Sequence, residues 1–191
     1  KTYDQDTEVW SVFGQGTFNF SEDWRLTLGL RYTDEEKEVV WGNEHVRPAV
    51  ALFIISPPVD PTPLNRTEDN LDGSINLQYD FDDQVMGYAS WARGSKSGGF
   101  ALSVASPDDA EYDTEEAETT EVGLKMSLAD GAALLNLSGF YTEIDNFQVV
   151  TFIGTGFLTS SIPAETYGAE FEGQWAVSPG FLLGASATLA H

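Results

Sequence analysis

The stretch that decides the fold is Trp24–Tyr32, which reads WRLTLGLRY. Its apolar residues occupy every second position, and the residues between them are polar or glycine. Because successive side chains of a strand point to opposite sides of a sheet, this period of two predicts a strand with one apolar face. The preceding stretch, Trp10–Phe20, alternates in the same way except at Phe13, and Ser21–Asp23 between the two predicts a tight turn. The sequence therefore predicts a β-hairpin here.

The same alternation returns further along the chain and predicts six more strands, although the facing of residues 84–93 is ambiguous. The eight predicted strands are Glu8–Phe20, Trp24–Thr33, Ser74–Phe81, Gln84–Arg93, Glu121–Leu128, Ala132–Ile144, Thr166–Trp175 and Phe181–Ala190. Short turns follow the odd-numbered strands, and three long loops (34–70, 94–117 and 145–163) follow the second, fourth and sixth. Three structureless loops longer than about 15 residues are uncommon in a compact soluble domain. Short turns alternating with long loops are typical of a transmembrane β-barrel.

Composition excludes several classes of function. The net charge of −22 argues against a nucleic-acid partner, because a polyanion would be repelled. The absence of cysteine excludes a disulfide framework and thiol catalysis. The longest apolar run, Ala49–Ile55, is far shorter than the roughly 18 residues that a membrane helix needs.

Aromatic residues gather beside the short turns, as in the girdles at the strand ends of membrane barrels. They are Phe18, Phe20, Trp24, Tyr79, Phe81, Trp175 and Phe181.

The first long loop holds five prolines between Pro48 and Pro63, which predict that no regular strand passes through Pro57–Pro63. Ala49–Ile55 in this loop could pack inward or cover a ligand.

Four stretches of the chain resemble strands of the TonB-dependent outer-membrane receptors, and they occur in that family's order. They are Phe13–Thr33 with its Gly29-Leu30-Arg31-Tyr32 ending, Tyr88–Phe100, Glu121–Lys125 and Tyr167–Glu172. The resemblance implies an all-β fold: an antiparallel transmembrane β-barrel segment with about eight strands of a barrel of about 22. It would cover residues 1–191, with the family's plug domain outside this range.

The resemblance also implies a function and a location. The chain would be part of a receptor in the bacterial outer membrane that takes up a scarce nutrient, such as a ferric siderophore, a corrinoid or an oligosaccharide. Its partners would be outer-membrane lipid and lipopolysaccharide, the plug domain of the same protein, the TonB energy-coupling complex and the small-molecule nutrient. No enzymatic activity and no cofactor are expected.

Ligand contacts are expected mainly in the three long loops, with charged residues of the barrel interior and the loops as further candidates. These candidates are Arg31, Arg93, Lys96, Glu170 and Glu172. Glu170 and Glu172 lie two apart on one strand face, roughly 7 Å by strand rise. Paired carboxylates at such a separation can serve glycoside hydrolysis, but a polar interior wall explains them better, and no catalytic or metal-binding residue is predicted.

Two other architectures fit the same alternation. Eight strands could close a small anchor barrel, which requires the first strand to pair with the last. Alternatively, a soluble β-sandwich with carbohydrate-binding loops would bury Leu28, Leu124 and Leu137 against a second sheet.

Overall fold

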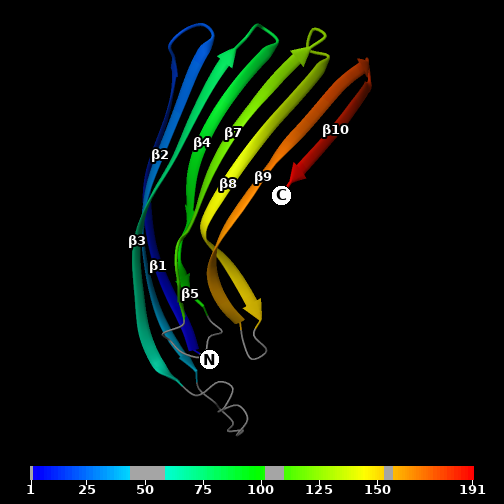
Figure 1. Ribbon diagram of the computed structural model, residues 1–191. Helices are drawn as coiled ribbons and strands as arrows, with labels where there is room; N and C mark the ends of the chain where they lie inside the picture. Colours follow the sequence, from blue (N-terminus) through cyan, green and yellow to red (C-terminus); the bar gives the residue numbers. More distant parts are fainter. Residues whose placement is uncertain (1, 44–58, 102–109, 153–156) are drawn as a thin grey trace.

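The computed structural model describes residues 2–43, 59–101, 110–152 and 157–191, and they form one long antiparallel sheet (Figure 1). The strands are β1 (Thr2–Asn19), β2 (Trp24–Asn43), β3 (Val59–Asp80), β4 (Val85–Lys96), β5 (Gly99–Phe100), β6 (Glu111–Tyr112), β7 (Glu115–Leu128), β8 (Ala133–Phe152), β9 (Phe157–Ser178) and β10 (Phe181–Ala190). Eight strands pair in the order β1-β2-β3-β4-β7-β8-β9-β10, and β5 pairs with β6 in a separate small hairpin. Within these residues no helix is long and apolar enough to span a membrane.

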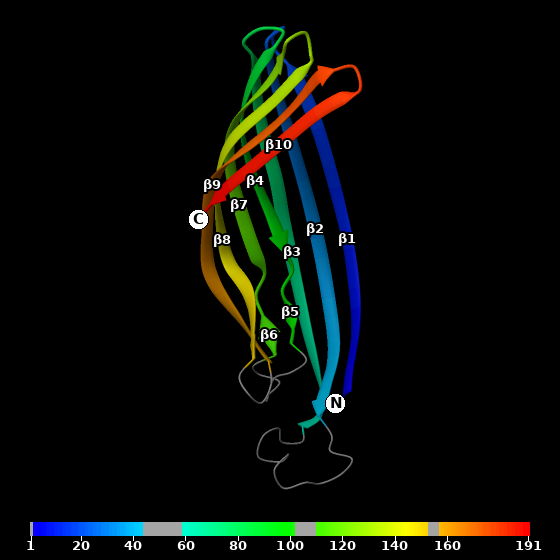
Figure 2. The ribbon, with the colours of Figure 1, turned by 90° about the vertical axis from the view of Figure 1, so that its right-hand side faces the viewer.

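The order of the strands excludes both alternative architectures. β1 and β10 lie at opposite edges of the sheet, so they do not close a small barrel (Figures 1 and 2). The predicted sandwich residues are not covered by a second sheet: Leu28, Leu124 and Leu137 have exposed fractions of 48%, 36% and 48%. The sheet is a wall with two open faces, consistent with a segment of a barrel of about 22 strands.

The short connections all lie at one end of the wall, at the top of Figure 1. In the β3–β4 turn, Asp82 Oδ1 accepts hydrogen bonds from the backbone N–H groups of Gln84 and Val85, at 2.7 and 2.8 Å. In the β7–β8 turn, Ala129, Asp130 and Gly131 all have positive φ, as tight hairpin turns require. The predicted hairpins are confirmed.

The strands continue well beyond their predicted ends at the opposite side. Much of the first predicted loop, 34–70, belongs to β2 and β3, and much of the third, 145–163, belongs to β8 and β9. The second, 94–117, holds the ends of β4 and β7 and the β5–β6 hairpin. These loop bounds were therefore wrong. Charged residues fill 34–38 of the β2 extension, whereas the β8 and β9 extensions, 145–152 and 157–165, carry few charges. None of these three segments keeps a regular alternation of apolar and polar residues.

The prediction that prolines prevent a strand through Pro57–Pro63 was also wrong, because β3 includes Pro61 and Pro63. The pairing of β3 explains this. β3 pairs with β4 only between Gly73 and Asp80, so its first half is bonded to β2 alone. A strand edge without a neighbour tolerates proline, which has no N–H to donate. The apolar stretch Ala49–Ile55 lies outside the described residues.

The register separates the two faces of the wall. Leu26, Leu77, Ala89 and Val122 are paired in succession from β2 to β7, so they lie on one apolar face. The facing of β4, ambiguous in the sequence, follows from the pairing of Leu77 with Ala89. The eight intervals from Trp24 to Tyr32 give about 27 Å along the strand at about 3.4 Å each. At a tilt of about 40° this is roughly 21 Å of height, most of an outer-membrane apolar band.

Aromatic rings border this apolar band at both ends. At the turn end, Trp24 and Tyr79 have ring centroids 4.6 Å apart, and Phe20 and Phe81 extend the row. At the other end, centroids are 5.3 Å apart for Trp10 and Tyr32 and 6.5 Å for Tyr141 and Tyr167. Only the row at the turns was predicted. The second row marks the other boundary of the band.

Candidate functional site

The polar face of the wall carries Arg31, which is paired in register with Asp72 of β3 but forms no salt bridge within the described residues. Arg31 donates to Ser11 Oγ at 2.9 Å and to Thr33 Oγ1 at 3.3 Å, and its guanidinium lies 5.9 Å from the centroid of the Phe13 ring. Among the residues that the structure describes, no carboxylate lies within 4.0 Å of it. The exposed Arg31 side chain therefore presents a cation to whatever faces the wall.

The other predicted site residues are spread over the wall rather than gathered. Lys96 at the end of β4 lies 3.6 Å from Glu115 of β7. Glu170 and Glu172 share the polar face of β9, where Glu172 accepts a hydrogen bond from Asn136 at 3.4 Å. β3, β4, β7 and β8 separate Arg31 from these carboxylates. The five candidates therefore do not form one pocket.

Arg93 does not face the polar side, so its predicted interior position was wrong. It is paired with Gly73 and lies two positions beyond Trp91 and four beyond Ala89, on the face that carries the apolar band. Its guanidinium forms an ion pair with Glu116 of β7 at 2.6 Å. The small residues Gly87 and Ala89 obscured this facing in the sequence.

A tyrosine on the polar face lies over a glycine of the next strand. Tyr88 O–H donates to Glu121 Oε1 at 2.5 Å, and Lys125 Nζ lies 5.5 Å from the centroid of the Tyr88 ring. A Cβ on Gly123 would lie 2.5 Å from the Tyr88 ring, so only glycine leaves room for it. This contact joins β4 to β7. The sequence feature that goes with it is a tyrosine on one strand and a glycine at the paired position of the next strand.

Beyond the apolar band, the polar face of β2 and β3 carries four charges in two adjacent rows. Glu35 is paired in register with Glu68, and Lys37 with Arg66. We call these four residues the charge quartet. Lys37 forms an ion pair with Glu35 at 2.9 Å, and Arg66 forms one with Glu68 at 2.8 Å. Sequence reasoning missed the quartet because this region was predicted to be a loop.

The β5–β6 hairpin lies against the charge quartet. Its described parts, 97–101 and 110–114, contact every member: Lys37 Nζ donates to Gly98 O at 2.6 Å, and Arg66 donates to Glu111 Oε1 at 2.7 Å. Ser97 donates to Glu35, and Thr114 Oγ1 donates to Glu68 Oε2 at 2.6 Å. The hairpin thus gives each charge of the quartet a partner.

An apolar cluster completes the contact between hairpin and wall. Trp41 and Ala110 are 1% and 0% exposed, and Tyr3, Leu64 and Ala101 pack against them. Tyr3 O–H donates to the carbonyl of Phe100, another buried hairpin residue, at 3.3 Å. The largest buried side chains of the described chain thus lie under this hairpin rather than in the band.

The charge quartet also lowers the pKa of one of its own members, Glu68. Burial raises the pKa of Glu68, but hydrogen bonds from Thr114 and Arg66 and the charge of Arg66 outweigh burial. The pKa of Glu68 therefore lies below its ordinary value, and the carboxylate is charged at neutral pH.

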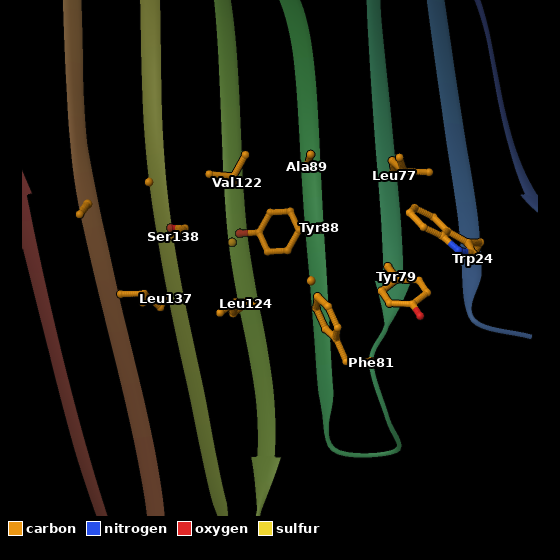
Figure 3. A pocket seen from close by; sticks show the side chains of 14 residues that line it. Trp24, Leu77, Tyr79, Phe81, Tyr88, Ala89, Val122, Leu124, Leu137 and Ser138 are labelled. Atoms are coloured by element: carbon orange, nitrogen blue, oxygen red, sulfur yellow. The ribbon is translucent and has the colours of Figure 1, made fainter.

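The apolar face carries a shallow groove of about 790 Å³ (Figure 3). Trp24, Tyr79 and Phe81 lie toward the turn end of this groove, and Leu124 and Leu137 lie across β7 and β8. Its floor contains small residues, among them Gly87 and Ala89. No charged residue lines the groove, which lies on the apolar band. The groove therefore suits contact with an apolar environment rather than with a polar ligand.

The family model described as "TonB dependent receptor-like, beta-barrel" matches residues 1–191. The chain belongs to this family. Together with its neighbours among solved outer-membrane receptors, this places it in the bacterial outer membrane. Among the described residues, no group of three or more side chains is arranged to hold a metal ion.

Solved structures show the same fold. The ferric yersiniabactin uptake receptor FyuA from Yersinia pestis has a TM-score of 0.81 and 17% identity, covering 98% of this chain and 27% of that chain. The siderophore receptor PiuA from Acinetobacter baumannii has a TM-score of 0.75 and 19% identity, covering 99% and 26%. The copper transporter OprC has a TM-score of 0.73 and 16% identity, covering 98% and 28%. The chain thus spans about a quarter of the length of these proteins.

Proposed function

We propose that this chain forms part of the barrel wall of a receptor for TonB-dependent uptake of a ferric siderophore. The observation that carries the proposal is the family match over residues 1–191, together with a sheet that has one apolar and one polar face. The printed names of FyuA and PiuA support the siderophore class. A corrinoid or an oligosaccharide is the alternative nutrient.

The two faces have different partners in this proposal. The apolar band, bordered by aromatic rows, contacts outer-membrane lipid, and lipopolysaccharide surrounds the end where the strands are extended. The polar face lines the lumen and faces the plug domain of the same protein, whose coupling to TonB drives uptake. Arg31, which is exposed and forms no salt bridge among the described residues, is suited to bind a plug carboxylate or an anionic ligand.

Uptake by the full-length receptor tests the proposal. A strain that lacks the receptor gene should fail to grow when a ferric siderophore is its sole iron source, and the intact gene should restore growth. Arg31→Gln should weaken uptake, because it removes the cation that faces the lumen. Thr27→Ser, a mild change on the same face of β2, is the matched control. Growth defects confined to a corrinoid or an oligosaccharide would overturn the siderophore assignment and retain the receptor.

A further inference from the structure

The charge quartet is an arrangement that a sheet does not stabilise by itself. Glu35 directly opposes Glu68, and Lys37 directly opposes Arg66. Like charges opposite each other on paired strands are destabilising, and two such rows are adjacent here. The ion pairs along each strand compensate part of this repulsion. The remaining partners come from the β5–β6 hairpin.

The hairpin's own carboxylates approach the quartet from the solvent side. The Glu111 and Asp113 side chains are 52% and 72% exposed and lie 2.7 and 3.8 Å from Arg66, whereas the Glu68 side chain is only 9% exposed. Exposed ion pairs are weak and are screened by salt. The bond between Arg66 and Glu68 is therefore part of the wall, whereas the bond between Arg66 and the hairpin is exchangeable.

The hairpin is also a small unit with little stability of its own. β5 and β6 have two residues each, and a short two-stranded hairpin is marginal in water. It stays in place through its contacts with the quartet and the cluster around Trp41, and through hydrogen bonds from the Gln148 and Asn146 side chains of β8 to its backbone carbonyls. Such weakly held elements open most easily in a folded protein.

We propose that residues 97–101 and 110–114 make an autoinhibitory contact. They occupy an anion-binding pair, Lys37 and Arg66, and the anionic group of a ligand in the lumen displaces them. Displacement would uncover Tyr3 and Trp41 beside the two cations, which makes a site for an anion that carries an apolar group. An anion that binds only the uncovered wall shifts the equilibrium toward that state. Because the cations lie on the polar face, the lumen rather than the lipopolysaccharide supplies this anion.

The contact can be measured in the full-length receptor with Ala110→Cys as a reporter, because Ala110 belongs to the hairpin and is fully buried against Trp41 of the wall. A neutral, membrane-impermeant maleimide should label this cysteine slowly. Inorganic phosphate should accelerate labelling several-fold relative to sodium chloride of equal ionic strength. Arg66→Gln should accelerate labelling by about threefold without phosphate, because an exposed ion pair to the hairpin is lost, and should remove the phosphate response. Arg66→Lys should retain the response.

Lys125→Gln is the matched control, since Lys125 is a cation of the same polar face that contacts the Tyr88 ring rather than the hairpin. It should leave both labelling rates unchanged. Heat-modifiable migration reports whether each variant is folded, and Ala101→Cys is a second reporter in the same cluster if Ala110→Cys fails to fold. An unchanged rate in phosphate, or an equal effect of Lys125→Gln, would overturn the inference. The inference rests on the proposed receptor function. Because labelling does not require uptake, a failure of the inference can be distinguished from a failure of the growth assay.

Discussion

Replacing Gly123 with alanine should weaken the joint between β4 and β7. The new Cβ would lie 2.5 Å from the Tyr88 ring and displace it from Glu121 and Lys125. Losing a hydrogen bond to a charged group costs about 2 kcal/mol, and losing the cation–π contact costs about 0.5 kcal/mol. Alanine regains about 0.5 kcal/mol over glycine in a strand. The net loss is about 2 kcal/mol, or roughly 30-fold in an equilibrium constant.

The assay is unfolding of the full-length receptor in detergent, followed by the fraction that migrates as folded protein. A double-mutant cycle isolates the contact: Gly123→Ala should cost nearly nothing once Tyr88→Ala has removed the ring. Gly139→Ala is the control, because a Cβ there meets only the carbonyl oxygen of Gly168 at 3.7 Å. If Gly123→Ala costs no more than Gly139→Ala, the steric and polar reasoning given for this joint is incorrect.

Three further outcomes are expected. Because the pKa of Glu68 is depressed in the folded protein, its contribution is present above its ordinary value of 4.5 and is lost as the pH falls through the folded value. The protection factors of the amides in 97–101 and 110–114, taken relative to intrinsic exchange at each pH, should therefore fall with acidification below about pH 4.5, and less so in Glu68→Gln. Leu137→Arg should lower the stability of the barrel in vesicles by about 2 kcal/mol, whereas Ser138→Arg, its neighbour on the opposite face, should be tolerated. Asp82→Ala should cost about 1–2 kcal/mol through two lost turn hydrogen bonds, and Asp83→Ala should be nearly neutral in the same unfolding measurement.

The sequence predicted the centre of each long strand because lipid and water impose opposite requirements on neighbouring positions there. Trp24–Tyr32 shows this rule without exception. Beyond the band both faces are polar, so Asp34–Lys37 reads as a loop although it continues β2. Strand pairing with β3, rather than a pattern within the segment, determines its structure.

The residues of the candidate site were harder to predict from the sequence, because their positions depend on which face a strand presents and on the register between strands. Arg31 could be assigned to the polar face because leucines flank it at alternate positions, whereas Arg93 follows small residues that fit either face. The charge quartet depends on a register between two distant segments, with Lys37 opposite Arg66. No periodicity within either segment contains that information.

The continuation of β2 beyond the aromatic boundary at Tyr32 gives the receptor a tall collar. The ten intervals from Thr33 to Asn43 at about 3.4 Å each give about 34 Å along the strand, or roughly 26 Å of height at a tilt of about 40°. In the proposed receptor, a molecule that approaches the lumen would pass this acid-rich extension before it reaches the depth of the lipid. Changes in length at the collar's rim can alter which molecules enter while the embedded part of the wall stays the same.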